Sequence, residues 1–165
     1  ITAGSLSGII SDRLQCRHGT MLGFGAMPLI AWSILVLWPG NINLGLLKLV
    51  FFMAGLGTGA YLMLMVMAKE VNSPAIAGLA TGTINTGSFL GVAVVQLLVG
   101  LILEATWDGV VKDNVPLYSL ASFRWGFSLC LLAVVVAYIT ALHLPETGAR
   151  NMGQQKEGEL FCQLK

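Results

Sequence analysis

Long apolar segments alternate with short polar ones along the chain, at intervals that fit membrane-spanning helices. A hydrophobic run of about 18 residues or more is long enough to cross the hydrocarbon layer of a bilayer as a helix. Four segments reach this length, and the start of the chain has the pattern of the last turns of a fifth helix. The fold class predicted is therefore all-α, a polytopic bundle of transmembrane helices. The predicted segments are residues 1–11 (partial), 20–38, 43–68, 74–103 and 120–144, followed by a polar tail at 145–165.

The segment 74–103 has no charged residue, yet it is not uniformly apolar. Asn85 and Gln96 lie eleven residues apart, close to three helical turns, so they share one face of the predicted helix. Phe89 lies between them on that face, and Thr81 and Ser88 lie at its edge. Amide and hydroxyl groups within a membrane normally face the bundle interior or a water-filled cavity. We therefore predict that this face lines a pathway filled by water or by a ligand.

The same helix carries a second stripe on another side. Gly87 and Gly91 are spaced as a small-xxx-small pair, which lets a neighbouring helix approach closely. The prediction is therefore one helix with a polar face and a separate close-packing face.

The composition supports a membrane protein and excludes several other classes. Of the 165 residues, 56% are hydrophobic and only 10% are charged, whereas soluble domains average about 25% charged residues. The net charge of +1 argues against a nucleic-acid partner. Three cysteines without zinc-like spacing predict reduced thiols, and we expect no metal and no cofactor. No nucleophile–base pair or carboxylate pair lies within the apolar segments, so the prediction is that the protein is not an enzyme.

The distribution of basic residues predicts the orientation. Cytoplasmic loops carry an excess of lysine and arginine. One side of the alternating segments holds most of these residues, whereas the other clearly holds only Lys112, with Lys48 and Arg124 near its border. We expect the basic side, and with it the C-terminal tail, to be cytoplasmic, and the protein to lie in the cell (inner or plasma) membrane. The basic side contains Arg13, Arg17, Lys69, Arg150, Lys156 and Lys165.

A short motif occurs where the first apolar segment ends. Gly8 is followed four residues later by Asp12 and Arg13, with a further base at Arg17. Glycine allows tight packing just before the helix ends, and the acid and bases at the membrane surface can exchange partners between two conformations. A conformational-switch turn is one interpretation of this motif, and an ordinary positive-inside turn is the other.

With this motif and this number of helices, the chain resembles the C-terminal half of a major facilitator superfamily transporter. The family joins its second and third helices by a Gly-x-x-x-Asp-Arg/Lys motif and repeats a weaker copy between helices eight and nine. The resemblance implies that residues 1–11 end helix eight and that the four spans are helices nine to twelve. Pro145-Glu146-Thr147 after the last span is similar to the Pro-Glu-Thr ending of sugar porters in that superfamily.

The resemblance also implies which helices face the solute. Helices ten and eleven line the cavity of this half, which adds Thr58 and Tyr61 to the candidates already placed on segment 74–103. The alternative interpretation for each of these side chains is hydrogen bonding between helices. The substrate-cavity candidates are Asn85, Gln96, Phe89, Thr81, Ser88, Thr58 and Tyr61.

The predicted function is part of a secondary active transporter that moves a small organic solute by alternating access. The expected partners are the lipid bilayer, an N-terminal half of the same protein (the chain begins at Ile1 within an apolar segment), the solute and a coupling ion. No ionisable residue lies in the middle of the four spans, which favours a neutral or zwitterionic solute. The alternative is a small non-transporting integral membrane protein, such as an assembly partner or the membrane anchor of a sensor.

Overall fold

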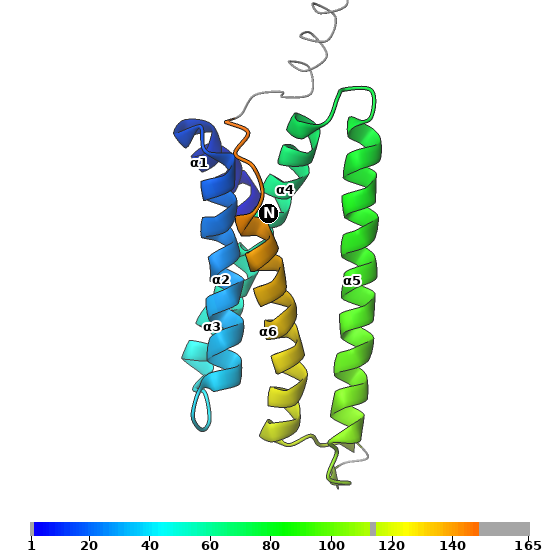
Figure 1. Ribbon diagram of the computed structural model, residues 1–165. Coiled ribbons are helices and arrows are strands. Elements are labelled where there is room, and N and C mark those ends of the chain that lie inside the picture. Colours follow the sequence, from blue (N-terminus) through cyan, green and yellow to red (C-terminus); the bar gives the residue numbers. More distant parts are fainter. Residues whose placement is uncertain (1, 113–114, 149–165) are drawn as a thin grey trace, which may run out of the picture.

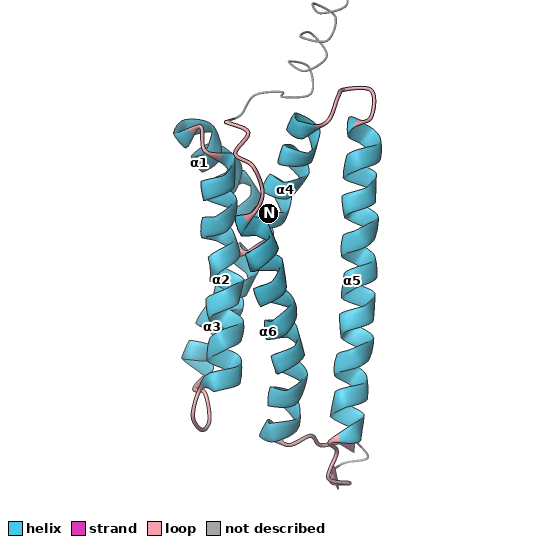
Figure 2. Cartoon of the chain, in the orientation of Figure 1, coloured by secondary structure: helices cyan, strands magenta, loops and turns pink. Residues whose placement is uncertain are grey.

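The computed structural model describes residues 2–112 and 115–148, and within them the chain is an all-α helical bundle, as predicted. Six helices follow one another along the chain, and a two-residue antiparallel ladder lies between the last two (Figures 1 and 2). Four helical segments in the described ranges are long and apolar enough to cross a membrane. The elements are α1 (Thr2–Leu14), α2 (Arg17–Leu37), α3 (Leu44–Leu56), α4 (Thr58–Val71), α5 (Ala77–Ala105), β1 (Val111–Lys112), β2 (Val115–Pro116) and α6 (Leu120–Leu142).

Helix α2 is the centre of the bundle, and it contacts α1, α3, α4 and α6. Two small clusters of buried apolar side chains surround it. Near its start, Met21 packs against Met63 and Met67 of α4. Near its end, Ala31 and Leu35 pack against Val50 of α3. Most other large apolar side chains are exposed on the outside of the bundle, which is the arrangement that a lipid environment allows.

Helix α5 stands to one side of the bundle (Figure 1), and its main contacts are with α4 and α6. None of its 29 residues is buried. Its exposed large side chains are Leu79, Phe89, Leu90, Val92, Val94, Leu97, Leu98 and Leu101.

The predicted single helix at 43–68 is divided in two at Gly57. The N–H of Gly57 donates to Ala54 O at 3.2 Å and its carbonyl accepts from Ala60 N at 3.0 Å, so the helix tightens there to a three-residue spacing. A Cβ on Gly57 would lie 2.7 Å from the ring of Pro28 in α2. The absence of a side chain at this position therefore lets α2 approach the α3–α4 junction.

The predicted helix ends also need correction. Helix α1 continues through Asp12 and Arg13 to Leu14, and α2 already starts at Arg17, so the predicted polar turn is only two residues long. Pro74 does not begin the long helix, which starts instead at Ala77. The N–H of Ile76 donates to Ser73 O at 3.0 Å, which makes Pro74 the second residue of a turn, a position that its fixed φ favours.

The connections alternate between the two ends of the bundle (Figure 1). The α1–α2 turn, the α4–α5 connection and the segment after α6 lie at one end, and the α2–α3 and α5–α6 connections lie at the other. This agrees with the alternation that the charge distribution predicts for the described residues. Arg150, Lys156 and Lys165, which the same prediction used, lie outside the described residues.

Candidate functional site

A cluster of charged side chains joins separate helices at the end of the bundle where α2 begins. The Arg17 guanidinium donates from Nη1 to Asp12 Oδ1 at 2.6 Å and from Nε to Glu70 Oε1 at 3.1 Å. The side chains of Arg17 and Glu70 are only 12% and 13% exposed, whereas Asp12 is 66% exposed. The Arg17–Glu70 pair therefore links α2 to α4 in a partly desolvated setting. We call this the Arg17 cluster; it comprises Ser11, Asp12, Arg17, Glu70, Glu146 and Thr147.

Two hydroxyl groups add hydrogen bonds to the ion pair. Ser11, which is fully buried in α1, accepts from Arg17 Nη1 at 3.1 Å. Thr147, buried in the segment after α6, donates to Glu70 Oε2 at 2.5 Å. A buried ion pair is stable only when its remaining donors and acceptors are satisfied. The cluster supplies such bonds to Arg17 Nε and Nη1 and to both Glu70 oxygens, from groups in α1, α2, α4 and the segment after α6.

Glu146 caps the start of α2 from a distance in the sequence. The first N–H groups of a helix have no partner within the helix, and the residue before α2, Cys16, makes no side-chain cap. The Glu146 carboxylate accepts instead from Arg17 N at 2.8 Å and His18 N at 3.0 Å, and from Cys16 Sγ at 3.2 Å. The positive end of the α2 dipole further favours the carboxylate at this position. The segment after α6 is thereby fixed to the start of α2.

These contacts change the acidity of Glu146. Partial burial alone would raise the pKa of this carboxyl group, but hydrogen bonds from Gly148, Cys16, Arg17 and His18 outweigh that effect. The net result is a pKa lowered from 4.5 to about 2. Glu146 is therefore ionised at neutral pH and held in place as an acceptor.

The structure brings together part of the predicted conformational-switch turn. Asp12 and Arg17 are paired, as an exchange of partners would require. Arg13 is exposed and makes no hydrogen bond or ion pair with the described residues, and a Cβ on Gly8 would meet nothing within 4 Å. The sequence reasoning did not anticipate Glu70 and Glu146 as the partners of α2, although the predicted orientation placed both acids on the same side as Arg17.

Asn85, at the centre of the predicted polar face, bonds to α4. Tyr61 Oη donates to Asn85 Oδ1 at 2.7 Å, which joins two of the seven cavity candidates across the α4–α5 contact. Both residues remain partly or fully exposed. This bond is the contact that the alternative interpretation, hydrogen bonding between helices, expected.

The remaining candidates are not gathered around this bond. The hydroxyl groups of Thr81 and Ser88 donate to carbonyl groups of α5 at 2.8–3.0 Å. The hydroxyl group of Thr58, the first residue of α4, donates to Gly55 O in the last turn of α3 at 2.9 Å. Phe89 is 68% exposed on the outer side of α5. Gln96 lies nearer the other end of α5, in a separate groove described below.

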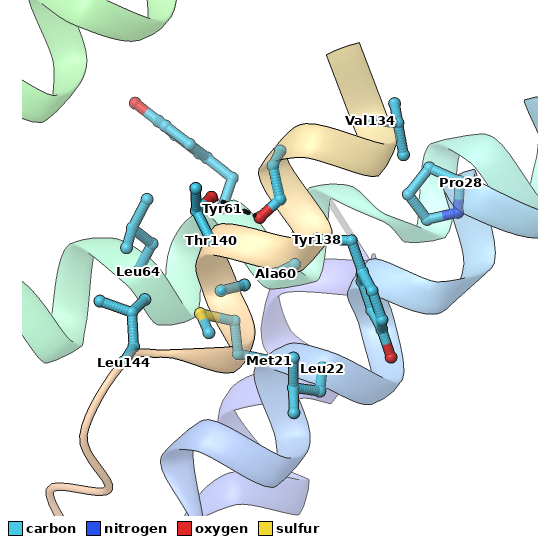
Figure 3. Close-up of a pocket in the computed structure, with 13 residues that line it drawn as sticks. Met21, Leu22, Pro28, Ala60, Tyr61, Leu64, Val134, Tyr138, Thr140 and Leu144 are labelled. Atoms are coloured by element: carbon cyan, nitrogen blue, oxygen red, sulfur yellow. Dashed lines mark hydrogen bonds between the residues drawn. The ribbon is translucent and has the colours of Figure 1, made fainter. Parts of the chain in front are cut away.

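An apolar cavity of about 490 Å³ lies between α2, α4 and α6 (Figure 3). Tyr61 and Tyr138 lie on opposite sides of it, with their hydroxyl groups pointing away from each other (Figure 3). The Thr140 hydroxyl donates to Ala137 O at 2.8 Å within α6. The cavity therefore offers a mainly hydrocarbon surface, and Tyr61 is the only predicted cavity residue that lines it among the described residues. Its other lining residues include Met21, Pro28, Leu64, Val134 and Leu144.

A second, wider groove of about 880 Å³ lies at the opposite end of the bundle, between the last turns of α5 and the β1–β2 hairpin. It contains Gln96 and three residues that sequence reasoning did not assign to a site, namely Glu104, Trp107 and Tyr118. We call it the Glu104 groove; it is lined by Ala93, Gln96, Leu97, Gly100, Leu101, Glu104, Trp107, Val111, Pro116 and Tyr118.

The predicted close-packing stripe of α5 has no partner in the described part of the chain. A Cβ on Gly87 or Gly91 would meet nothing within 4 Å. Close approaches occur instead at Gly4, which faces Leu62, and at Gly59, where a Cβ would lie 2.7 Å from Phe24. The prediction that another helix packs against Gly87 and Gly91 is not met by the described helices.

Comparison with protein-family models, with curated proteins and with solved structures finds no match for this chain. The resemblance to the major facilitator superfamily therefore stays a prediction, which depends on the motif residues quoted for it.

Proposed function

We propose that the four spans form one wall of the solute pathway of a secondary transporter that works by alternating access. The observation that supports this most directly is the position of Asn85 and Gln96 on α5. Both amides lie on an exposed face of a 29-residue apolar helix without a single charged residue from Ala77 to Leu103. Polar groups at membrane depth are costly against lipid. Water, solute or another group of helices on this face would remove that cost.

The Arg17 cluster supplies the other part of the proposed mechanism. In alternating access, two groups of helices rock against each other around a site near the membrane midplane. Such a cycle needs contacts that hold one conformation and can be broken. Ion pairs between helix ends meet this need, because their partners are hydrated as they separate. We propose that the Arg17 cluster holds this end of the bundle together in one conformation of the cycle.

The proposed solute is a small organic molecule that is not multiply charged. The pathway face provides amide, hydroxyl and aromatic groups, and no ionisable side chain lies near its middle. We propose that no group within the four spans couples transport to an ion. A coupling ion would bind instead on the helices of the expected N-terminal half, across the pathway.

A second candidate, a non-transporting membrane protein, is favoured by one observation. Asn85 already has a partner in Tyr61, and the hydroxyl groups of Thr81, Ser88 and Thr58 all donate to backbone carbonyl groups within four residues in the sequence. In that case the polar groups of α4 and α5 would serve packing alone. The two candidates differ in whether water reaches the face that carries Asn85 and Gln96.

Cysteine accessibility tests this difference without knowledge of the substrate. The native thiols are first replaced by Cys16→Ser, which keeps a donor to Glu146, together with Cys130→Ala and Cys162→Ser. Single cysteines are then placed at Asn85 and Gln96, with matched controls at Leu90 and Val94, which lie about 140–180° around the helix from Asn85. A charged methanethiosulfonate reagent reacts only with thiols that water reaches.

The proposed pathway predicts that cysteines at 85 and 96 react several-fold faster than those at 90 and 94 in the membrane-embedded protein. Equal rates at all four positions, or faster reaction at 90 and 94, would contradict it. Once an uptake screen has found a substrate, Asn85→Ala and Gln96→Ala should reduce uptake more than Gly87→Ala does.

A further inference from the structure

The Glu104 groove is lined by a carboxylate, an amide and two aromatic rings, together with apolar side chains. The last turns of α5 form one wall, and the hairpin with Trp107 and Tyr118 forms the other. The carbonyl of Val110 accepts from Leu117 N at 2.9 Å and from Trp107 Nε1 at 3.2 Å, so one backbone group holds both the hairpin and the indole. Tyr118 packs edge-on against Phe123, with ring centroids 6.1 Å apart. The aromatic wall is therefore fixed rather than free to collapse into the groove.

Glu104 is the one charged residue among those that line the groove. Glu104 lies in the last turn of α5, where the helix dipole already places partial negative charge and a carboxylate is unfavourable. Its carboxylate has no hydrogen bond or ion pair with the side chains that the structure describes. A cation beside the Glu104 carboxylate would offset its negative charge.

The cationic side chain of α6, Arg124, forms its hydrogen bonds away from the groove. Arg124 donates from Nη2 to the carbonyl groups of Trp38 and Gly40, in the connection between α2 and α3. It therefore fixes that connection to the start of α6 and does not point its charge at the Glu104 groove.

The aromatic wall selects among cations. An ammonium group is attracted to the faces of tryptophan and tyrosine, and aromatic side chains commonly form the binding sites of quaternary ammonium ligands. A divalent metal needs six or more oxygen ligands or a cluster of carboxylates, and Glu104 is the single carboxylate that lines the groove. An anion would be repelled by Glu104. The apolar lining by Leu97, Leu101 and Val111 suits carbon substituents on the cation.

We infer that the Glu104 groove binds a small organic ammonium ion, with the Glu104 carboxylate and the faces of Trp107 and Tyr118 around the cation and the Gln96 amide beside it. The inference deepens the proposed function, because it names a substrate class at one end of the pathway face. It rests on that function for its role in transport, whereas binding itself can be measured independently.

The four tryptophans of the chain provide the probe. The protein is labelled with 5-fluorotryptophan, placed in lipid nanodiscs and studied by fluorine NMR, and the Trp107 resonance is assigned with Trp107→Phe. Choline is compared with 3,3-dimethylbutan-1-ol, which has the same shape but no charge. Choline should shift the Trp107 resonance saturably, and the alcohol should not. Trp125, at the same end but outside the groove, and Trp32, packed on Phe127 at 5.4 Å, serve as internal controls.

A matched pair of variants separates direct contact from general charge. Glu104→Gln should raise the apparent dissociation constant for choline by about two- to fivefold, the effect of one exposed ion pair. Asp108→Asn removes the same charge four residues away, outside the groove lining, and should leave the constant nearly unchanged. An unaltered Trp32 resonance in Glu104→Gln shows that the fold is intact.

The inference is overturned if the alcohol shifts Trp107 as choline does, if no ligand shifts it, or if the two variants weaken binding equally. Asn85 lies outside the groove lining, so labelling at position 85 is independent of choline binding. Choline binding without labelling at 85 would remove the pathway and keep the ammonium site, whereas labelling at 85 without choline binding would do the reverse.

Discussion

The Arg17 end of the bundle and helix α5 differ in the contacts that hold them to the rest of the protein. At the Arg17 end, α1, α2, α4 and the segment after α6 are joined by ion pairs and by hydrogen bonds of 2.5–3.2 Å. Helix α5 is the longest span, yet it has no buried residue, and its one side-chain hydrogen bond to another helix in the described structure is that from Tyr61 to Asn85. The chain thus concentrates specific contacts where helices end and leaves its longest helix weakly held.

This difference has a physical basis in the bilayer. Apolar side chains gain little by packing on one another when lipid tails are equally apolar, so shape and polar contacts decide which helices associate. Helices α2 and α4 meet these demands with Gly57, Gly59 and Pro28, whereas the glycines of α5 face open space.

Removal of the Arg17 side chain should have the largest effect among the variants that test the difference between the Arg17 end and helix α5. Arg17→Ala would leave Glu70 partly buried without its ion partner, and loss of one member of a buried pair costs about 3–5 kcal/mol. We expect the free energy of unfolding in micelles, measured by denaturant titration, to fall by about 3 kcal/mol. Arg13→Ala, one turn earlier and exposed, is the matched control and should change it by less than about 0.5 kcal/mol. Equal effects of the two variants would show that the cluster contributes no specific stability.

Glycine substitutions compare the tightly packed helices with α5 directly. In Gly59→Ala the new Cβ would lie 2.7 Å from the buried Phe24 ring, so the free energy of unfolding should fall by about 1–3 kcal/mol. Gly87→Ala meets no atom within 4 Å, and should leave stability unchanged or raise it by up to about 1 kcal/mol through helix propensity. Thermal unfolding in the same micelles measures both. A destabilising Gly87→Ala would instead reveal a helix that packs on α5 in the native protein.

The sequence pattern was sufficient to predict the fold class and the spans, because a run of apolar residues longer than the membrane thickness leaves few alternatives to a helix. It failed at Gly57, since the break there depends on the Pro28 ring, which lies 29 residues earlier in the chain. It also failed at Pro74, which fits the first helical position and the second position of a turn equally well. Local signals cannot separate these cases.

The candidate site was predicted less completely. Helical periodicity placed Asn85 and Gln96 on one face, but it could not show which side chains surround each amide. The structure places the two amides in different surroundings. Two of the partners of Arg17, Glu70 and Glu146, lie 53 and 129 residues away in the chain. Such pairs depend on how the helices associate, so charge bias could place them at the same end but could not pair them.

The Tyr61–Asn85 hydrogen bond tests whether α5 is held as weakly as the comparison implies. Tyr61→Phe and Asn85→Leu, with the double variant, form a thermodynamic cycle that isolates the energy of this contact. Hydrogen bonds between transmembrane helices average about 0.6 kcal/mol and reach about 1.7 kcal/mol. We expect a coupling free energy within this range, measured by denaturant titration. A coupling of zero would mean that α5 is held by shape alone and that Asn85 is free for water or solute.

The contact of Glu146 with α2 is expected to make the stability of the Arg17 end depend on pH. Its pKa of about 2 in the folded protein lies below the ordinary 4.5, so its ionised form stabilises the fold. This contribution is complete above about pH 4.5 and is lost as the pH falls toward about 2. Glu146→Gln keeps the size of the side chain but removes the titration, so its free energy of unfolding should fall less steeply than that of the unsubstituted protein over this pH range. Parallel pH profiles for the two proteins would contradict the proposed cap, since the start of α2 would then be stabilised equally well without a carboxylate.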